Sequence, residues 1–376
     1  MSRADDLVLV LNAGSSSLKY QVLRMPAGEV LLRAHVELVE AGGWGQALAD
    51  VTTAVDGAGL SGRLRAIGHR VVHGGTRHTS PAVVDDALIA SVEELAELAP
   101  LHNPPAVSGM RHAAAAFPDI PQVAVFDTGF FADLPEAAAR YAIDVELADA
   151  EGIRRYGMHG ISHGYLVQRT ADLLERPLAE LSLITLHLGN GASAAAVQGG
   201  RPLDTSMGLT PVEGLVMGSR SGDLDPGVLL HLLRHRGYDA DGLDDLLNHR
   251  SGLRGLYGST DVRDVLAAVA AGDPRALLAH EIYCRRIRKY VGAYLALLGG
   301  ADAIVFAGGA GEHQPKVRAD ALAGLAGLGI EVDPERNDAV VAEAGVISPD
   351  GAGVTVLVVP TDEELAIARE AVALLG

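Results

Sequence analysis

The stretch LVLVLNAGSSSLKYQVL, residues 7–23, decides the fold. An apolar segment leads through a cluster of small residues into a second strand-like segment, and SLITLHLGNGASAAAVQ, residues 182–198, repeats this design. When Asn12 is aligned with His187, the two copies lie 175 positions apart, about half of the 376-residue chain. Two domains of one design are therefore expected, each with a small-residue turn whose backbone N–H groups can bind phosphate. This pattern predicts phosphoryl transfer from a nucleotide.

The composition limits the possible classes of function. A net charge of −18 argues against nucleic acid as the main partner. Cys284 is the only cysteine, so an internal disulfide and a cysteine-based metal site are both excluded. The acidic start MSRADDLVLV passes directly into a strand pattern, so we expect no signal peptide. Because no apolar run reaches about 20 residues, we expect no membrane span and a soluble, cytoplasmic protein.

Alternating strand and helix patterns predict an α/β fold. Strands are expected at residues 7–11, 18–23, 66–72, 122–126, 183–188, 194–198, 303–306 and 354–359. Helices are expected at residues 85–98, 162–175, 226–236, 261–271, 274–298 and 363–374. We expect residues 41–62 to form a loose Gly/Ala-rich connection, and a domain boundary to fall within residues 130–150.

The two small-residue turns are the first candidate phosphate sites. Residues 12–19 lack the Gly-Lys-Ser/Thr of a Walker A motif and predict a strand-to-strand phosphate loop. Ser15 and Ser17 would supply hydroxyls and Lys19 a charge, although an ordinary hairpin turn is the alternative. HLGNG, residues 187–191, is the second predicted phosphate loop.

Polar residues at strand ends and turns are further candidates. In HRVVHGG, residues 69–75, Arg70 could clamp a carboxylate or phosphate, or be a surface arginine. APLHNPP, residues 99–105, predicts a rigid turn that holds His102 and Asn103. Asp127 closes a strand, where ligands of α/β folds bind, and could hold Mg²⁺, orient a nucleophile or cap a helix.

Three more segments carry candidate groups. In RYGMHGISH, residues 155–163, the spacing of His159 and His163 could place both on one helix face, yet a zinc site would need a third ligand. Residues 206–227 supply Arg220, Asp223 and Asp225 in a Gly-rich loop too long for a simple connector, so we expect it to line a ligand. FAGGAGEH, residues 306–313, predicts a glycine turn that a base and ribose can approach closely.

Two further segments, at residues 361–365 and 285–290, can be interpreted both structurally and functionally. In TDEEL, residues 361–365, Thr361 and Glu364 fit a capping box, which leaves Glu363 available for Mg²⁺. RRIRKY, residues 285–290, lies in the predicted long helix, and we expect a solvated helix face or a subunit contact there.

In its motifs and their order, the chain resembles the acetate kinase family over nearly its whole length. The matching segments are NAGSSSLKYQ, GHRVVHGG, LAPLHNPP, VFDT, YGMHG, HLGNG, DTSMG and EELAIARE. The resemblance implies two duplicated actin-like (ribonuclease H-like) α/β domains with a central interdomain cleft. It places residues 1–130 with 365–376 in the acid and phosphate domain, and 131–364 in the domain that binds nucleotide and forms a homodimer.

The resemblance also implies an activity. This is reversible, Mg²⁺-dependent transfer of the γ-phosphoryl group of ATP to acetate by direct in-line displacement, giving acetyl phosphate and ADP; Mn²⁺ is a possible substitute. It implies no nucleic-acid or membrane partner, and phosphate acetyltransferase as a pathway neighbour.

Carried over position by position, the resemblance implies roles for individual residues. Arg70, Asp127, His159 and Arg220 would be catalytic. The acid would contact Arg70, Val72, Leu101, His102, Met158 and Pro211. ATP would contact Ser15, Ser17, Lys19, His187, Gly189, Asn190, Gly191, Asp261, Val262, Arg263, Gly309 and Gly311. Asn12 and Glu363 would lie at the metal.

The chain departs from the family pattern at three places. Met158 and Val262 each replace a phenylalanine, and Gly129-Phe130-Phe131 replaces Ala-Phe-His. Because Met is adaptable, a longer acid could fit, so propionate or another short-chain acid stays open as the acceptor. The remoter alternatives are a sugar or polyol kinase, which would need an aspartate base, and an actin-like ATPase without an acid acceptor.

Overall fold

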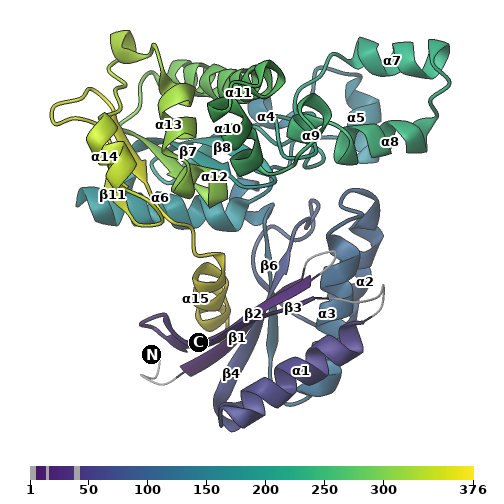
Figure 1. Ribbon diagram of the computed structural model, residues 1–376. Helices are drawn as coiled ribbons and strands as arrows, with labels where there is room; N and C mark the ends of the chain where they lie inside the picture. The colour runs from purple at the N-terminus through teal and green to yellow at the C-terminus, as the bar shows by residue number, and fades with distance from the viewer. Residues whose placement is uncertain (1–5, 14–16, 38–42) are drawn as a thin grey trace. The chain divides into compact units, whose positions relative to one another are not determined.

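The computed structural model describes residues 6–13, 17–37 and 43–376. The chain divides into two compact units. The first unit comprises residues 1–132, 158–165 and 362–376, and the second comprises residues 133–157 and 166–361. Each unit is built on one six-stranded mixed sheet, and Figure 1 labels strands of both sheets.

The sheet of the first unit has the order β3-β2-β1-β4-β6-β5. Its strands are β1 (Asp6–Ala13), β2 (Ser17–Met25), β3 (Glu29–Glu37), β4 (Leu64–Val71), β5 (Ala82–Val83) and β6 (Gln122–Phe126). The first three strands are antiparallel neighbours, β1, β4 and β6 run parallel, and β5 pairs antiparallel with β6.

The second sheet repeats this plan strand for strand, in the order β9-β8-β7-β10-β12-β11. Its strands are β7 (Ser182–Leu188), β8 (Ala192–Gln198), β9 (Arg201–Thr205), β10 (Ala303–Ala307), β11 (Gly345–Val346) and β12 (Thr355–Val358). Each pairing has the same sense as its counterpart in the first sheet. The prediction of two duplicated α/β domains is confirmed.

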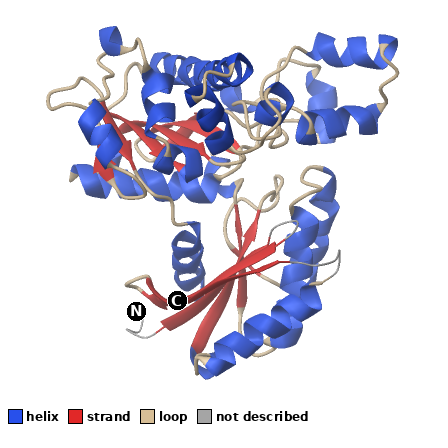
Figure 2. Ribbon diagram, viewed as in Figure 1, coloured by secondary structure: helices blue, strands red, loops and turns tan. Residues whose placement is uncertain are grey.

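The packing of strand β1 on both of its faces explains why its sequence is apolar without alternation. Leu7, Leu9 and Leu11 pack in one core with helix α1 (Trp44–Gly57), while Val8 and Val10 pack in another with helix α15 (Glu363–Leu375). A strand covered by helices on both faces buries every side chain, so a continuous apolar run is expected. Figure 2 shows helices on both sides of this sheet.

The prediction of a loose connection over residues 41–62 is wrong for the part that the structure describes. Helix α1 occupies most of it and buries Trp44, Ala47, Leu48, Val51 and Val55. These positions recur with the spacing of one helix face. The sequence contains this helical period, but the Gly, Ala and Thr residues between the buried positions make it hard to recognise. The rest of the first unit's helical layer is α2 (Asp86–Glu94) and α3 (Asn103–Ala116).

The second unit carries most of the remaining helices. Helix α6 (Gly160–Leu174) begins in the first unit and ends in the second, and α11 (Pro274–Leu298) packs against β7 and β8. The others are α4 (Glu136–Ala139), α5 (Val145–Glu151), α7 (Pro226–His235), α8 (Ala240–His249), α9 (Gly252–Leu256), α10 (Val262–Ala270), α12 (Gly308–His313), α13 (Pro315–Leu322) and α14 (Pro334–Ala339). None of the described helices combines the length and the apolar character that crossing a bilayer requires.

The glycine segment at residues 306–313 differs from its prediction. We expected a turn, but β10 passes directly into α12, whose first residue is Gly308. Gly308 has φ of 73°, and a Cβ there would lie 2.8 Å from the backbone of Leu188. Glycine is therefore needed at this position because α12 approaches the end of β7 closely, and not because the chain forms a connecting turn there.

Candidate active site

In the first unit, the main polar group lies at the carboxyl ends of two parallel strands. Arg70 is near the end of β4, and Asp127 follows β6, its neighbour in the sheet. Arg70 Nη2 lies 2.7 Å from Asp127 Oδ2, and Nε lies 3.4 Å from Oδ1. The Asp127 side chain has no exposed surface. Ligands of α/β folds bind at this edge of a sheet, so the structure brings together two of the predicted catalytic residues.

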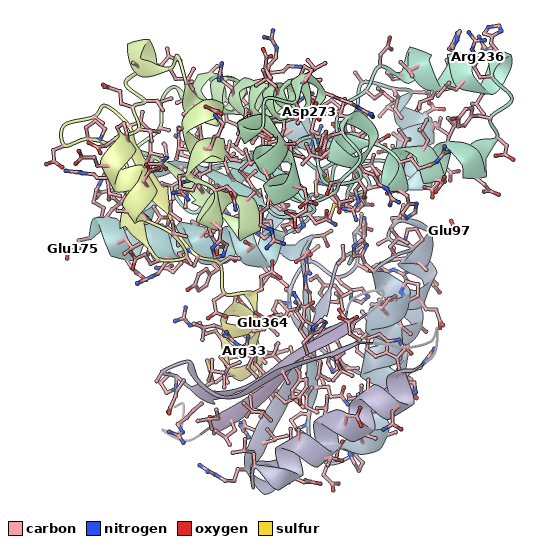
Figure 3. The ribbon with its side chains drawn as sticks, viewed as in Figure 1. Arg33, Glu97, Glu175, Arg236, Asp273 and Glu364 are labelled. Atoms are coloured by element: carbon pink, nitrogen blue, oxygen red, sulfur yellow. The ribbon has the colours of Figure 1, made fainter. Side chains whose placement is uncertain are left out.

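The start of α15 adds two more carboxylates to this group. Arg70 Nε lies 3.6 Å from Glu363 Oε2, and Asn12 Nδ2 donates to Glu364 Oε1 at 3.4 Å. Burial opposes the charge of Arg70, but the charges of Asp127, Glu363 and Glu364 outweigh burial and raise the pKa of Arg70. Figure 3 labels Glu364 at this helix. Glu364 is a site residue that the sequence analysis missed.

The missed role of Glu364 follows from a wrong prediction of the helix cap. The N-cap of α15 is Asp362, whose carboxylate accepts from the backbone N–H of Leu365 at 2.9 Å. A capping box between Thr361 and Glu364 was expected instead. Aspartate is at least as good an N-cap as threonine, and the sequence offered both. With Asp362 as the cap, Glu364 is available to contact Asn12.

The predicted rigid turn at residues 99–105 is in part the beginning of α3. Asn103 is the first residue of this helix, and its buried side chain accepts from His73 N at 3.1 Å. It also donates to the carbonyl oxygens of His73 and Val92, at 3.0 and 3.3 Å. Asn103 thus fixes the chain just beyond Val72, which is buried. The predicted acid-binding residues Leu101 and His102 lie half-buried immediately before the helix.

The segment with Met158 and His159 passes close to Asp127. Met158 is 1% exposed, and His159 has φ of 59°, in the left-handed region. Gly160 then opens α6, and a Cβ at this glycine would lie 1.9 Å from the carbonyl oxygen of Asp127. Only glycine permits that approach.

The expectation that His159 and His163 share one helix face is wrong. His159 precedes α6, whereas His163 lies inside it, is buried and meets the ring of Phe131 edge-on at 5.6 Å. Within the described ranges, no cluster of three or more His, Cys, Asp or Glu side chains is arranged to hold a metal ion.

The first predicted phosphate loop has the predicted strand-to-strand form. Strands β1 and β2 pair antiparallel, with Asn12 opposite Lys19. Ser17 is half-buried and Lys19 is exposed. Ser15 lies outside the described residues, so its predicted role stays a prediction.

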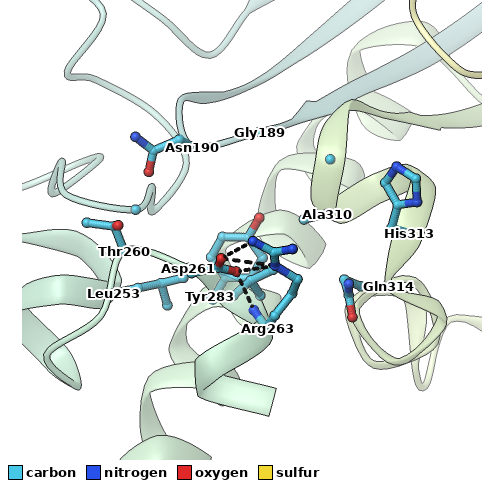
Figure 4. Close-up of a pocket in the computed structure, with 13 residues that line it drawn as sticks. Gly189, Asn190, Leu253, Thr260, Asp261, Arg263, Tyr283, Ala310, His313 and Gln314 are labelled. Carbon is cyan, nitrogen blue, oxygen red and sulfur yellow. Dashed lines mark hydrogen bonds and ion pairs between the residues drawn. The ribbon is translucent and has the colours of Figure 1, made fainter. Parts of the chain in front are cut away.

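The second unit contains a cavity of about 510 Å³. It lies among the turn after β7, the start of α10 and helix α12 (Figure 4). Its lining residues are Gly189, Asn190, Gly218, Leu253, Thr260, Asp261, Val262, Arg263, Tyr283, Gly309, Ala310, His313 and Gln314. Of the predicted nucleotide contacts, six line this cavity: Gly189, Asn190, Asp261, Val262, Arg263 and Gly309.

Three further predicted nucleotide contacts adjoin the lining residues in the sequence, whereas Ser15, Ser17 and Lys19 belong to the first unit. His187 is half-buried in β7, Gly191 belongs to the turn that follows, and Gly311 is buried in α12. Four lining residues lie outside the predicted ligand-binding segments: Leu253, Thr260, Tyr283 and Gln314. Thr260 and Gln314 adjoin predicted segments, whereas Tyr283 reaches the cavity from α11 and had no local signal.

Two features shape the cavity walls. Gly218 N donates to Asn190 O at 2.9 Å, and a Cβ at Gly218 would lie 1.9 Å from Asn190 Oδ1. Asp261 caps α10 and accepts from Arg263 N at 2.8 Å and from its Nε at 3.0 Å (Figure 4). These hydrogen bonds from Arg263 lower the pKa of Asp261. One wall of the cavity thus carries the Asp261–Arg263 ion pair, and the turn after β7 forms another part of its lining.

Arg220 differs from Arg70 in that no carboxylate of the described residues balances its charge. It is half-buried, and its Nη1 donates to the carbonyl oxygen of Pro211 at 3.3 Å. Burial lowers the pKa of Arg220, and within the described part of the chain no carboxylate forms an ion pair with it. A half-buried guanidinium that forms no ion pair among the described residues is suited to bind an anion.

The other two acidic residues of the loop have structural partners. Asp225 caps α7 by accepting from Gly227 N at 2.9 Å, and Asp223 accepts from Gly214 N at 3.0 Å. Arg286 and Tyr290 of α11 also reach this loop. The expected solvated face at residues 285–290 is therefore only partly correct: of these residues, Arg285 and Lys289 alone are exposed.

Comparison with known proteins places the chain in a family. The model of the acetokinase family matches residues 46–369. The chain belongs to the acetokinase family. It is 51% identical to an acetate kinase of Streptomyces avermitilis, an alignment that covers 98% of this chain and 97% of the relative.

Solved structures agree with this family assignment. The acetate kinase of Porphyromonas gingivalis superposes with a TM-score of 0.92 and is 41% identical, covering 99% of this chain and all of that one. A propionate kinase of Francisella tularensis gives 0.91 at 35% identity, covering 98% and 99% of the two chains. The predicted fold of two duplicated α/β domains is confirmed by this agreement and by the repeated strand order.

Proposed function

We propose that this member of the acetokinase family is an acetate kinase, which transfers the γ-phosphoryl group of ATP to acetate and forms acetyl phosphate and ADP. The observation that carries the proposal is the 51% identity with an acetate kinase over 98% of the chain. The cavity in the second unit, with its glycine turns, is of a size that fits the nucleoside part of ATP. Arg70 and Arg220 supply cationic groups for an anionic acid and a transferring phosphoryl group.

In the proposed reaction, the protein has to orient the two substrates and neutralise negative charge. An acetate carboxylate is ionised at neutral pH, so its oxygen can attack the γ-phosphorus in line without a general base. Catalysis then comes from orientation and from neutralising the charge that spreads over the equatorial oxygens. We assign that neutralisation to Arg220, because no carboxylate among the described residues holds its charge, with His159 as a second donor.

Arg70 has a different role in this proposal. Its Nε and Nη2 face Asp127 and Glu363, which leaves Nη1 outside those pairs. We propose that Nη1 binds the carboxylate of the acid, and that His102 assists. Val72, Leu101, Met158 and Pro211 would provide the apolar contacts for the methyl group.

Among the described residues, no three His, Cys, Asp or Glu side chains are arranged to hold a metal ion by themselves. We therefore propose that the residues around Arg70 would hold a magnesium ion together with the phosphates of ATP. Three carboxylates, Asp127, Glu363 and Glu364, share a single guanidinium, so negative charge is in excess, and the Asn12 amide adds a further oxygen. Mg²⁺ in phosphoryl-transfer sites takes one or two carboxylates together with substrate phosphates. When bound, the ion would neutralise the phosphates of ATP, and Mn²⁺ could replace it. We propose Asn12 and Glu363 as its nearest protein groups, with Glu364 orienting Asn12.

A second candidate function is the same reaction on propionate. Met158 is buried in place of the phenylalanine of the family pattern, and a propionate kinase is 35% identical over 98% of this chain. The experiment that tests both functions traps the acyl phosphate with hydroxylamine, and measures kcat/KM for the C2, C3 and C4 acids in wild type and Met158→Phe. We expect acetate to be preferred. A higher kcat/KM for propionate that Met158→Phe reverses would establish the second function.

The finer properties that the resemblance implies remain proposals. We propose that the enzyme is a cytoplasmic homodimer, and that phosphate acetyltransferase is its pathway neighbour. Light scattering of the purified chain would test the dimer, and a monomer at working concentration would contradict it.

A further inference from the structure

We propose that Asp223 is a positioning residue for Arg220. Together with Arg286 and Tyr290 of α11, it closes the base of residues 214–223, which we call the Arg220 loop. The inference rests on the proposed function, since Asp223 gains this role only if Arg220 meets the transferring phosphoryl group. Asp223 acts through the backbone of the loop, because the Arg220 side chain donates to the carbonyl oxygen of Pro211 and not to Asp223.

The base of the Arg220 loop is closed by reciprocal hydrogen bonds. Gly214 N donates to Asp223 Oδ1 at 3.0 Å, and Asp223 N donates to Gly214 O at 3.0 Å. The two ends of a ten-residue segment are thereby held together by one side chain and one backbone contact. Without the Asp223 carboxylate, the Gly214 N–H would lose its partner, and such a loss is costly for a buried group.

Side chains of helix α11 form hydrogen bonds with both ends of the Arg220 loop. The Tyr290 hydroxyl lies 3.0 and 3.1 Å from the two Asp223 carboxylate oxygens. Arg286 Nη1 donates to Gly214 O at 2.8 Å, and its Nη2 donates to Asp223 O at 3.2 Å. Arg286 and Asp223 also form an ion pair with 3.5 Å between Nη1 and Oδ2. The long helix therefore contacts both ends of the loop at once.

The far side of the Arg220 loop is joined to other elements. Gly218 N donates to Asn190 O at 2.9 Å, in the turn that borders the cavity. The Ser219 hydroxyl donates to Asn248 O at 2.7 Å, and Leu253 N donates to Met217 O at 2.9 Å. Arg220 thus lies between a closed base and a wall of the proposed nucleotide cavity.

Glycines at both ends permit this closure. Gly214 has φ of 109° and Gly222 has φ of 67°, both in the left-handed region. A Cβ at Gly222 would lie 2.4 Å from Leu215 O and 2.5 Å from Gly214 O. The chain therefore uses glycines where the loop closes on itself, and this arrangement presets the backbone that carries Arg220. A donor aimed at developing charge is most effective when it is preset in this way.

The groups that face Asp223 come from its own loop and from α11. Glu213, the residue before the loop, is held separately: Arg155 Nη2 lies 2.7 Å from its Oε1, and the Tyr141 hydroxyl donates to its Oε2. Variants at Asp223, Tyr290 and Arg286 therefore address the base of the loop and leave the Glu213 contacts in place.

The test compares Asp223→Ala with a matched control, Asp225→Ala, in the full-length enzyme. Both substitutions remove one carboxylate from the same segment, but Asp225 only caps α7. We expect Asp223→Ala to lower kcat about 10- to 100-fold with KM for ATP nearly unchanged. Asp225→Ala should lower Tm and keep kcat. Asp223→Asn, which retains an acceptor oxygen, should recover part of the loss.

A double-substitution cycle separates positioning from a structural role. If Asp223 acts through Arg220, Asp223→Ala should change kcat by less than about twofold in an Arg220→Ala background. Should Asp223→Ala fail to fold, Tyr290→Phe removes one hydroxyl and should show the same pattern more weakly. The proposal would be overturned if either variant lowered kcat as much in the Arg220→Ala background as in the wild-type background. It would also be overturned if Asp223→Ala and Tyr290→Phe both had the kcat of wild type. Failure of the proposed function would be distinguishable, because wild-type protein would then form no acyl phosphate.

Discussion

The Arg70 guanidinium lies 2.7 Å from a carboxylate, that of Asp127, which has no exposed surface. Arg70 lies in β4 and Asp127 directly follows β6, its parallel neighbour, so the pair is established by the sheet rather than by any local motif. Asp127 therefore compensates the charge of Arg70 and, in our proposal, contributes to the excess negative charge that favours magnesium.

We predict that Asp127→Asn weakens magnesium use. The substitution keeps the shape of the side chain but removes its charge, so the concentration of Mg²⁺ that gives half-maximal rate should rise. The free energy of unfolding should fall by about 2 kcal/mol, because Arg70 loses a charged hydrogen-bond partner. Activity titrations with Mg²⁺ and urea unfolding measure both effects, with exposed Asp119→Asn as the control.

The Mg²⁺ titration of Asp127→Asn also tests the reaction class. Activity that partly returns at high Mg²⁺ is the expected result. Complete loss at every Mg²⁺ concentration would instead indicate an aspartate base, as a sugar or polyol kinase requires.

We predict that Arg220→Ala reduces kcat about 10³-fold, by analogy with other arginines that stabilise phosphoryl transfer. KM for acetate should change far less, since Arg220 is assigned to the transition state rather than to the bound acid. Steady-state kinetics on acetate and ATP measure both constants. Arg236→Ala, an exposed arginine of the second unit, is the control. An unchanged kcat in Arg220→Ala would exclude its assigned role.

Gly218→Ala should weaken nucleotide binding. A Cβ at this position would lie 1.9 Å from Asn190 Oδ1 and 2.9 Å from Thr260 O, so the cavity wall must shift. We expect the Kd for ATP to rise about tenfold, which corresponds to ~1.4 kcal/mol and lies within the cost of overpacking. Calorimetric titration with ATP measures it. Gly292→Ala in α11, where nothing lies within 4 Å of the added atom, should bind as wild type does; equal Kd values for the two variants would contradict the assignment.

His69 should make the protein less stable in mild acid. This histidine is 2% exposed, and its Nε2 lies 2.6 Å from Gln122 Oε1. Burial lowers the pKa of His69 to about 4, from 6.5 in the unfolded chain, although the Gln122 contact opposes this. Between these values the unfolded chain binds the extra proton. The contribution of His69 is therefore complete above pH 6.5 and is lost as the pH falls toward 4.

The size of the His69 effect follows from the pKa difference, which corresponds to about 3 kcal/mol in the free energy of unfolding. Urea unfolding at several pH values between 4 and 7 would measure it, in wild type and in His69→Asn. The variant should show a shallower dependence on pH in this range. Equal slopes for the two proteins would contradict the prediction.

The sequence predicted the features of this fold that are local. Strands such as β1 and β7 are short apolar runs, and the small residues after His187 mark the turn between β7 and β8. The repeat then predicted two domains, because it doubles one local pattern. Arg70 and Asp127 were both predicted as strand-end residues, but their pairing depends on the order of strands in the sheet.

The features that the sequence did not reveal arise from tertiary contacts. Glu364 matched a capping box equally well, and only the choice of Asp362 as the cap directs it to Asn12. Arg286 and Tyr290 looked like part of a solvated basic face, because their partner Asp223 is more than sixty residues away in sequence. Tyr283 reaches the cavity from the same helix, for which the sequence offers only a helical period.

The central claim is that this chain transfers the γ-phosphoryl group of ATP to the carboxylate of a small acid. Phosphorus-31 NMR of the purified protein with ATP, Mg²⁺ and acetate tests it most directly. We predict that acetyl phosphate and ADP appear together, and that ATP persists when acetate is omitted. Release of inorganic phosphate at the same rate with or without acid, or the absence of any acyl phosphate from folded protein, would contradict the account.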